Sequence, residues 1–109
     1  MRVHYLTDIN NFRTIITNTS DRPAVFDFIA SSSESCKATS PIINRFSAMN
    51  ELKGVDFYRV DIEAASAISQ EAQVTSVPTF ALYKNGARTK VVTGANLEAL
   101  QDLVVTAAL

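Results

Sequence analysis

The chain has 109 residues, of which 47% are hydrophobic and 19% charged, a composition typical of one small globular domain. Ten basic residues stand against 11 acidic ones, so the chain lacks the sustained positive field that nucleic-acid binding requires. No segment is apolar for long enough to cross a bilayer, and the first residues lack the pattern of a secretory signal. We therefore expect one domain over residues 1–109, cytoplasmic and mainly monomeric, with no nucleic-acid or membrane partner.

Cysteine and histidine each occur once, as Cys36 and His4. A single cysteine excludes an internal disulfide and a cysteine-rich zinc site. His4 falls in a predicted strand with no partner pattern for a Ser-His-Asp triad, which argues against a hydrolase. We expect no metal and no cofactor.

The first half of the chain alternates strand and helix signals. Residues 3–6 favour a strand, and Thr7 or Asp8 can cap the helix that follows, whose apolar face carries Ile9, Phe12, Ile15 and Ile16. Residues 23–30 are nearly all apolar, as in strands buried on both faces. This strand should lie at the centre of the sheet.

A serine-rich loop then leads into a helix that we expect to begin at the N-cap Ser33 and to end at Gly54. Pro41 lies inside that helix and should kink it. Residues 55–61 favour a strand, and the alanine-rich residues 63–72 favour a helix.

The last third of the chain predicts a hairpin and a helix. Asn85-Gly86 suits a type I′ turn between strands at 79–84 and 87–93, and a final helix carries Leu97, Leu100 and Leu103 on one face. The element order is βαβαβαββα. It predicts an α/β fold with a mixed central sheet and helices on both faces.

Five fragments, in this order, resemble the thioredoxin family: Val25-Phe26-Asp27-Phe28-Ile29-Ala30, Ser33-Glu34-Ser35-Cys36-Lys37 followed by Pro41, Val77-Pro78-Thr79-Phe80, Lys84-Asn85-Gly86, and Thr93-Gly94-Ala95. The resemblance covers nearly the whole chain and implies the thioredoxin fold. It also implies protein or peptide substrates that carry disulfides or thiols.

The active segment departs from the family pattern Trp-Cys-Gly-Pro-Cys. Ser32 replaces the tryptophan, Ser33 the first cysteine, and Glu34-Ser35 the Gly-Pro pair. In the family the first cysteine attacks the substrate disulfide, and a serine hydroxyl cannot form a disulfide. Natural divergence and an engineered Cys-to-Ser change at position 33 both fit, and the other replacements favour a chain that was already atypical.

Three residues of this segment and its neighbouring strand are candidate catalytic residues. Cys36 falls in the first turn of a helix, where the dipole favours a thiolate, but it could equally be a small buried hydrophobe. A reactive Cys36 would form a mixed disulfide, a glutathione adduct or an intermolecular disulfide. Ser33 is better explained as the N-cap than as a catalytic group.

Asp27 is an ionisable residue inside an apolar strand, where burial should raise its pKa. The resemblance implies that it assists proton transfer at Cys36; a strand-edge position facing water is the alternative. Arg59 and Lys37 are most simply solvated charges, although Arg59 could approach Asp27 from the neighbouring strand.

The Val77-Pro78 bond is expected to be cis, which would leave the preceding backbone free to pair with an extended peptide. The resemblance places Val77, Pro78, Gly94 and Ala95 in a substrate groove, beside Ser32, Ser33 and Glu34. Three functions remain open: an impaired disulfide oxidoreductase, a non-catalytic protein-binding module, and a monothiol redox sensor acting through Cys36.

Overall fold

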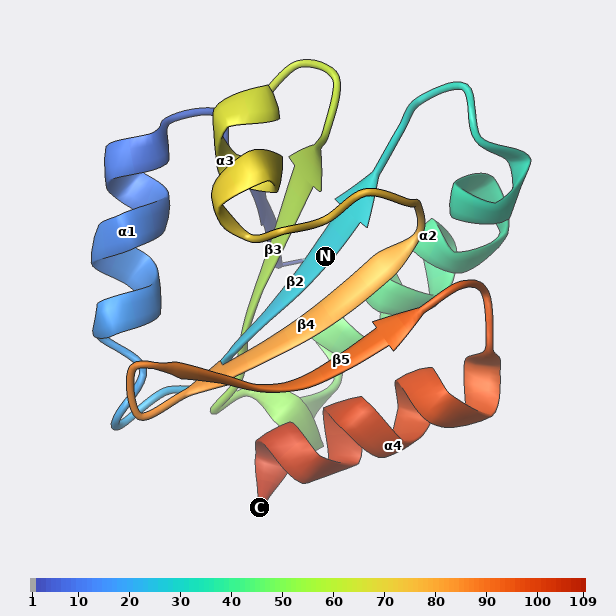
Figure 1. Cartoon of the computed structure of the whole chain (residues 1–109). Coiled ribbons are helices and arrows are strands. Elements are labelled where there is room, and N and C mark those ends of the chain that lie inside the picture. The colour runs from blue at the N-terminus through green and yellow to red at the C-terminus, as the bar shows by residue number, and fades with distance from the viewer. Residues whose placement is uncertain (1) are drawn as a thin grey trace.

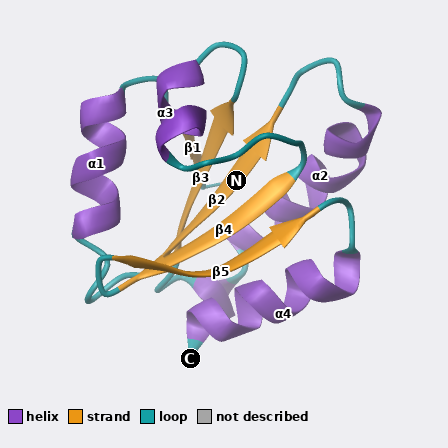
Figure 2. Ribbon diagram, viewed as in Figure 1, coloured by secondary structure: helices purple, strands orange, loops and turns teal. Residues whose placement is uncertain are grey.

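The computed structural model describes residues 2–109 and shows one five-stranded sheet in the order β1-β3-β2-β4-β5, covered by helices on both faces (Figures 1 and 2). The elements are β1 (Val3–Tyr5), α1 (Ile9–Thr17), β2 (Ala24–Ile29), α2 (Glu34–Ala48), the 3₁₀ helix η1 (Asn50–Leu52), β3 (Asp56–Asp61), α3 (Ser66–Glu71), β4 (Thr79–Lys84), β5 (Ala87–Thr93) and α4 (Leu97–Ala108). This arrangement confirms the predicted fold class and element order. In the described part of the chain, no helix is long and apolar enough to cross a membrane.

Strand β2 is the central strand, as its apolar sequence predicts. It runs parallel to β3, with Asp27 opposite Arg59, and antiparallel to β4, with Asp27 opposite Phe80. All six of its residues are buried. Alternate side chains therefore face the two helical layers, and every backbone polar group of the strand has a neighbouring strand to pair with.

The two faces of the sheet carry separate hydrophobic clusters. Val25 and Phe80 pack with residues of α2 and α4, whereas Phe26 and Phe28 pack with residues of α1 and α3. Figure 1 shows α1 and α3 together on one side of the sheet and α2 and α4 on the other. Because Asp27 shares the face of Val25, it points toward the α2 layer among apolar neighbours.

Side chains at the helix starts follow the capping rules. Asp8, rather than Thr7, caps α1 by accepting the N–H groups of Asn10 and Asn11, and Asn96 caps α4 through the N–H of Ala99. Ser33 caps α2, as predicted. Each cap satisfies backbone donors that the helix leaves without a partner.

Two helix boundaries differ from the prediction. Helix α2 ends at Ala48, because Met49 is extended, and the separate 3₁₀ turn η1 precedes Gly54. Helix α3 begins only at Ser66, because the carboxylate of Asp61 accepts the N–H groups of Glu63 and Ala64 in a turn before it. A hydrophobic period reports neither the extended backbone at Met49 nor the local hydrogen bonds of Asp61.

The β4–β5 hairpin turns at Asn85 and Gly86, whose φ angles are +55° and +79°. These positive values are what a type I′ turn requires at its two central residues. The turn is anchored to the loop after α1, because the N–H of Asn85 donates to the carbonyl of Thr19 and the N–H of Gly86 donates to the Thr19 hydroxyl.

We predict that Gly86→Ala lowers the free energy of unfolding by about 1 kcal/mol, because an L side chain is strained at positive φ. Gly54→Ala is the matched control: Gly54 has ordinary φ, and a Cβ there meets nothing within 4 Å. Urea unfolding of both variants measures the difference. Equal stability of the two variants would contradict the turn assignment.

Candidate functional site

The candidate site lies at the edge of the sheet where β2 ends and α2 begins. Three segments meet there: the loop into α2, the residues before β4, and the loop from β5 into α4 (Figure 1). The last two are joined directly, because the N–H of Gly94 donates to the carbonyl of Pro78 at 2.8 Å. The fold thus brings together regions around positions 33, 78 and 94 that are far apart in the sequence.

Ser33 is fixed by three hydrogen bonds at the start of α2. Its N–H donates to the carbonyl of Ala30 at 3.0 Å, and its carbonyl accepts the N–H of Lys37 at 3.1 Å. Its hydroxyl oxygen accepts the N–H of Cys36 at 3.3 Å. The side chain therefore serves as the helix cap, in agreement with the structural role predicted for it.

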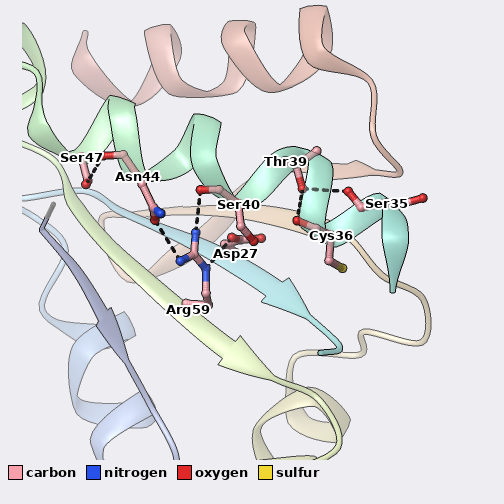
Figure 3. Close-up of polar contacts among 8 residues, drawn as sticks. All are labelled: Asp27, Ser35, Cys36, Thr39, Ser40, Asn44, Ser47 and Arg59. Carbon is pink, nitrogen blue, oxygen red and sulfur yellow. Dashed lines mark hydrogen bonds and ion pairs between the residues drawn. The ribbon is translucent and has the colours of Figure 1, made fainter. Parts of the chain in front are cut away.

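Cys36 is buried, with 3% of its surface exposed, and it is the third residue of α2. Thr39 lies one turn later, and its hydroxyl donates to the carbonyls of Ser35 and Cys36 (Figure 3). Of the two environments expected for Cys36, the structure favours the buried one. Its thiol is therefore shielded from large reactants.

Asp27 forms an ion pair with Arg59, whose Nε donates to Asp27 Oδ2 at 2.8 Å. Both side chains are almost fully buried, with 0% and 2% exposure. The guanidinium also donates to Asn44 Oδ1 at 2.9 Å and to the carbonyl of Ser40 at 3.1 Å, so that it links the sheet to α2 (Figure 3). The ring of Tyr5 lies 5.8 Å from the guanidinium carbon.

The prediction that Arg59 is a solvated charge is wrong, and the alternative, an approach to Asp27, is confirmed. Arg59 is two residues from Phe57 along β3, so it shares the face that packs against α2. Lys37 is exposed, as expected, and pairs with Glu34 at 3.2 Å. Asp27 is confirmed as buried rather than at a wet strand edge.

Burial raises the pKa of Asp27 above its usual 3.8, and the charge and hydrogen bond of Arg59 lower it by less. The second carboxylate oxygen, Oδ1, is buried without a hydrogen-bond partner among residues 2–109. Arg59 contacts only one of the two carboxylate oxygens. A buried carboxylate needs several donors to replace its water, so the effect of desolvation on the pKa of Asp27 is the larger one.

One contact at the site has no counterpart in the sequence prediction. The Ser31 hydroxyl donates to Asp61 Oδ2 at 2.8 Å, which ties the loop before Ser33 to the end of β3. This bond and the N–H of Glu63 lower the pKa of Asp61. The sequence indicates this contact only weakly. It predicts that the ends of two parallel strands lie side by side, but not that Ser31 and Asp61 meet there.

The remaining predicted groove residues lie on the three meeting segments. Ser32, Glu34 and Ala95 are exposed, Val77 and Gly94 are half-buried, and Pro78 is buried. The Val77-Pro78 bond is cis. Within the described residues, neither the N–H nor the carbonyl of Val77 has a hydrogen-bond partner.

The thioredoxin family model matches residues 2–106 of the chain. The chain belongs to the thioredoxin family. A thioredoxin of Coprinus comatus is 35% identical over 94% of each chain, and the thioredoxin Asp f 29 of Aspergillus fumigatus is 34% identical over 94% of this chain and 92% of its own. The solved Malassezia sympodialis thioredoxin has a TM-score of 0.91 at 28% identity, over 100% of this chain and 96% of its own.

This thioredoxin-family chain is therefore a thioredoxin-like member of a family of thiol-disulfide oxidoreductases and contains only one cysteine. Its single thiol, Cys36, stands in the first turn of α2, and an N-cap hydroxyl stands three residues before it. No second thiol exists to share a disulfide with Cys36 in the same chain.

We predict that Arg59→Met destabilises the protein by about 3 kcal/mol at pH 7, because it leaves Asp27 as an unpaired buried charge. The folded-state pKa of Asp27 is already above the unfolded value, so its ionisation removes stability as pH rises through the interval between them. Loss of Arg59 raises that pKa further. The deficit should therefore shrink at about pH 3.5, where Asp27 is largely protonated in both proteins.

Urea unfolding of both proteins at the two pH values measures this deficit. In Asp27→Val combined with Arg59→Met, neither buried charge remains, and most of the lost stability should return at pH 7. A deficit that is the same at both pH values would show that the pair acts through packing and not through charge.

Proposed function

We propose that this thioredoxin-family protein binds extended polypeptides at the groove beside α2 and does not act as a dithiol reductase. The observation that carries the proposal is the state of positions 33 and 36. Ser33 presents a hydroxyl that caps the helix, and Cys36 is a buried thiol without a sulfur partner.

The chemistry of disulfide reduction explains why one thiol is insufficient. A dithiol donates two electrons to a substrate disulfide in two steps: one thiolate attacks and forms a mixed disulfide, and the second thiolate then displaces the substrate and closes an internal disulfide. With Cys36 alone the second step has no attacking sulfur. A mixed disulfide, once formed, would persist until an external thiol released it.

The groove retains the features that hold a polypeptide backbone. Val77, two residues before β4, offers an N–H and a carbonyl that have no hydrogen-bond partner among residues 2–109, which suits the addition of a short extended segment. Ala95 and Ser32, on the other two segments of the candidate site, are small and exposed. With Ser32 in place of the family's tryptophan, the groove is more polar than the pattern of the family implies.

The buried state of Cys36 counts against a monothiol redox sensor, because sensor cysteines are accessible and of low pKa. Peptides with disulfides or thiols are the ligands that the family's chemistry suggests. A cytoplasmic location and a mainly monomeric state stay predictions.

We predict negligible reduction of insulin disulfides by this chain with dithiothreitol as reductant. Ser33→Cys should raise the rate by at least about ten-fold, because the new sulfur stands at the N-cap three residues before Cys36. The matched control is Ser33→Cys with Cys36→Ser, which can attack but cannot resolve. Mixed with insulin without dithiothreitol, it should trap a mixed disulfide; with dithiothreitol, its rate should stay below that of Ser33→Cys, because only the external thiol can release the substrate. Insulin reduction by the unchanged chain at the rate of an ordinary thioredoxin would refute the proposal.

The groove itself is tested with a peptide that has no free thiol, such as the carboxymethylated insulin B chain. In a titration followed by amide NMR, we expect shifts at Val77, Gly94 and Ala95. Ala95→Arg should weaken binding by about five-fold by obstructing the groove. Ala67→Arg, an equal change at an exposed position on α3, should have no effect. Shifts confined to other surfaces would contradict the assignment.

A further inference from the structure

A hollow lies at the edge of the sheet opposite the candidate site, where β1, β2 and β3 begin. It has a volume of about 200 Å³ and is lined by Arg2, His4, Arg22, Ser47, Lys53, Val55 and Asp56. Strand β2 separates it from the groove beside α2 by the length of its six residues, roughly 20 Å. The mechanism proposed above uses none of these residues.

The charge in this hollow is opposite in sign to that of the whole protein. The chain has a formal net charge of −1, whereas three permanent cations and one carboxylate line the hollow. Ser47 belongs to the last turn of α2, and a helix carboxyl end adds about half a negative charge. The three positive charges exceed the sum of this half charge and the charge of the Asp56 carboxylate, so the hollow remains positive.

Most of its cationic donors are unused. Arg22 donates through Nε and Nη2 to Asp56 Oδ1, at 3.1 and 2.8 Å, and through Nη2 to the carbonyl of Lys53 at 2.8 Å. Its Nη1, the guanidinium of Arg2 and the ammonium of Lys53 have no acceptor among residues 2–109. A fixed guanidinium flanked by free cations is the arrangement that recognises phosphate oxygens.

The backbone that carries these groups is held in place. The N–H of Arg2 donates to Ser47 Oγ at 2.9 Å, and the Ser47 hydroxyl donates to the carbonyl of Asn44 at 2.7 Å. The volume is below the range of pockets that enclose a drug-sized molecule. It therefore suits one tetrahedral anionic group and not an entire nucleotide.

We propose that this hollow is a binding site for a phosphate group, either free or as a monoester. Arg22 supplies the oriented guanidinium, and Arg2 and Lys53 supply the remaining positive charge. The ligand binds without a covalent step. The proposal is independent of the function of the groove, because the two sites share no residue.

The test is a titration of the full ¹⁵N-labelled chain with inorganic phosphate, followed by amide NMR at constant ionic strength. We expect saturable shifts at positions 2, 22 and 53–56, with a Kd of about 1 mM or tighter. Combined Arg2→Gln and Lys53→Gln changes should weaken binding by at least about ten-fold. Neither side chain makes a hydrogen bond within the described chain, so the fold should persist.

Lys90→Gln, on β5, is the matched control and should bind as the unchanged chain does. Phosphoserine in place of inorganic phosphate separates the two sources: equal or tighter binding identifies a monoester site, and binding of inorganic phosphate alone identifies a site for the free anion. Undiminished binding by the double variant, or shifts spread over lysines and arginines elsewhere, would overturn the proposal. A failure of peptides to bind at Val77 would count against the proposed groove and not against the phosphate site, because the two share no residue.

Discussion

The ion pair between Asp27 and Arg59 is the contact on which the arrangement of this protein depends. It joins the two central parallel strands, and through Asn44 and the carbonyl of Ser40 it fastens α2 to the sheet. Only a guanidinium can serve three acceptors in this way, because its N–H groups diverge in one plane, whereas a lysine offers one compact ammonium. The cation thus holds the middle of α2 against the sheet, and the same helix carries Ser33 at its N-cap and Cys36 in its first turn.

The same contact gives a buried carboxylate two opposing influences. Desolvation favours its neutral form, and Arg59 favours its charged form, with desolvation the larger of the two. A buried carboxylate in this position lowers the stability of a core unless it takes part in catalysis or has a well-placed ion-pair partner. Arg59 is such a partner, and it accounts for the presence of Asp27 on structural grounds alone. The role in proton transfer that the family pattern implies for Asp27 belongs to a cycle of two cysteines, and this chain has one cysteine.

Local signals in the sequence were sufficient for the fold. The apolar run of β2, the turn residues Asn85 and Gly86, and the cap at Ser33 each act over a few positions, and each was found where predicted. The pairing of Arg59 with Asp27 depends on a partner 32 residues away and on which face of β3 the arginine occupies, which the sequence leaves open. The hydrogen bond from Ser31 to Asp61 escaped prediction for the same reason.

The hydrogen bond between Gly94 and Pro78 affects how the proposed groove would respond to a bound peptide. It joins the segment before β4 to the loop after β5, which form one wall of the proposed groove, so this wall cannot open without breaking a backbone hydrogen bond. A peptide that binds there would meet a wall that is already ordered in the folded protein. Binding would then cost little further conformational entropy of the protein. Selectivity between peptides would then depend on how readily each peptide adopts an extended conformation.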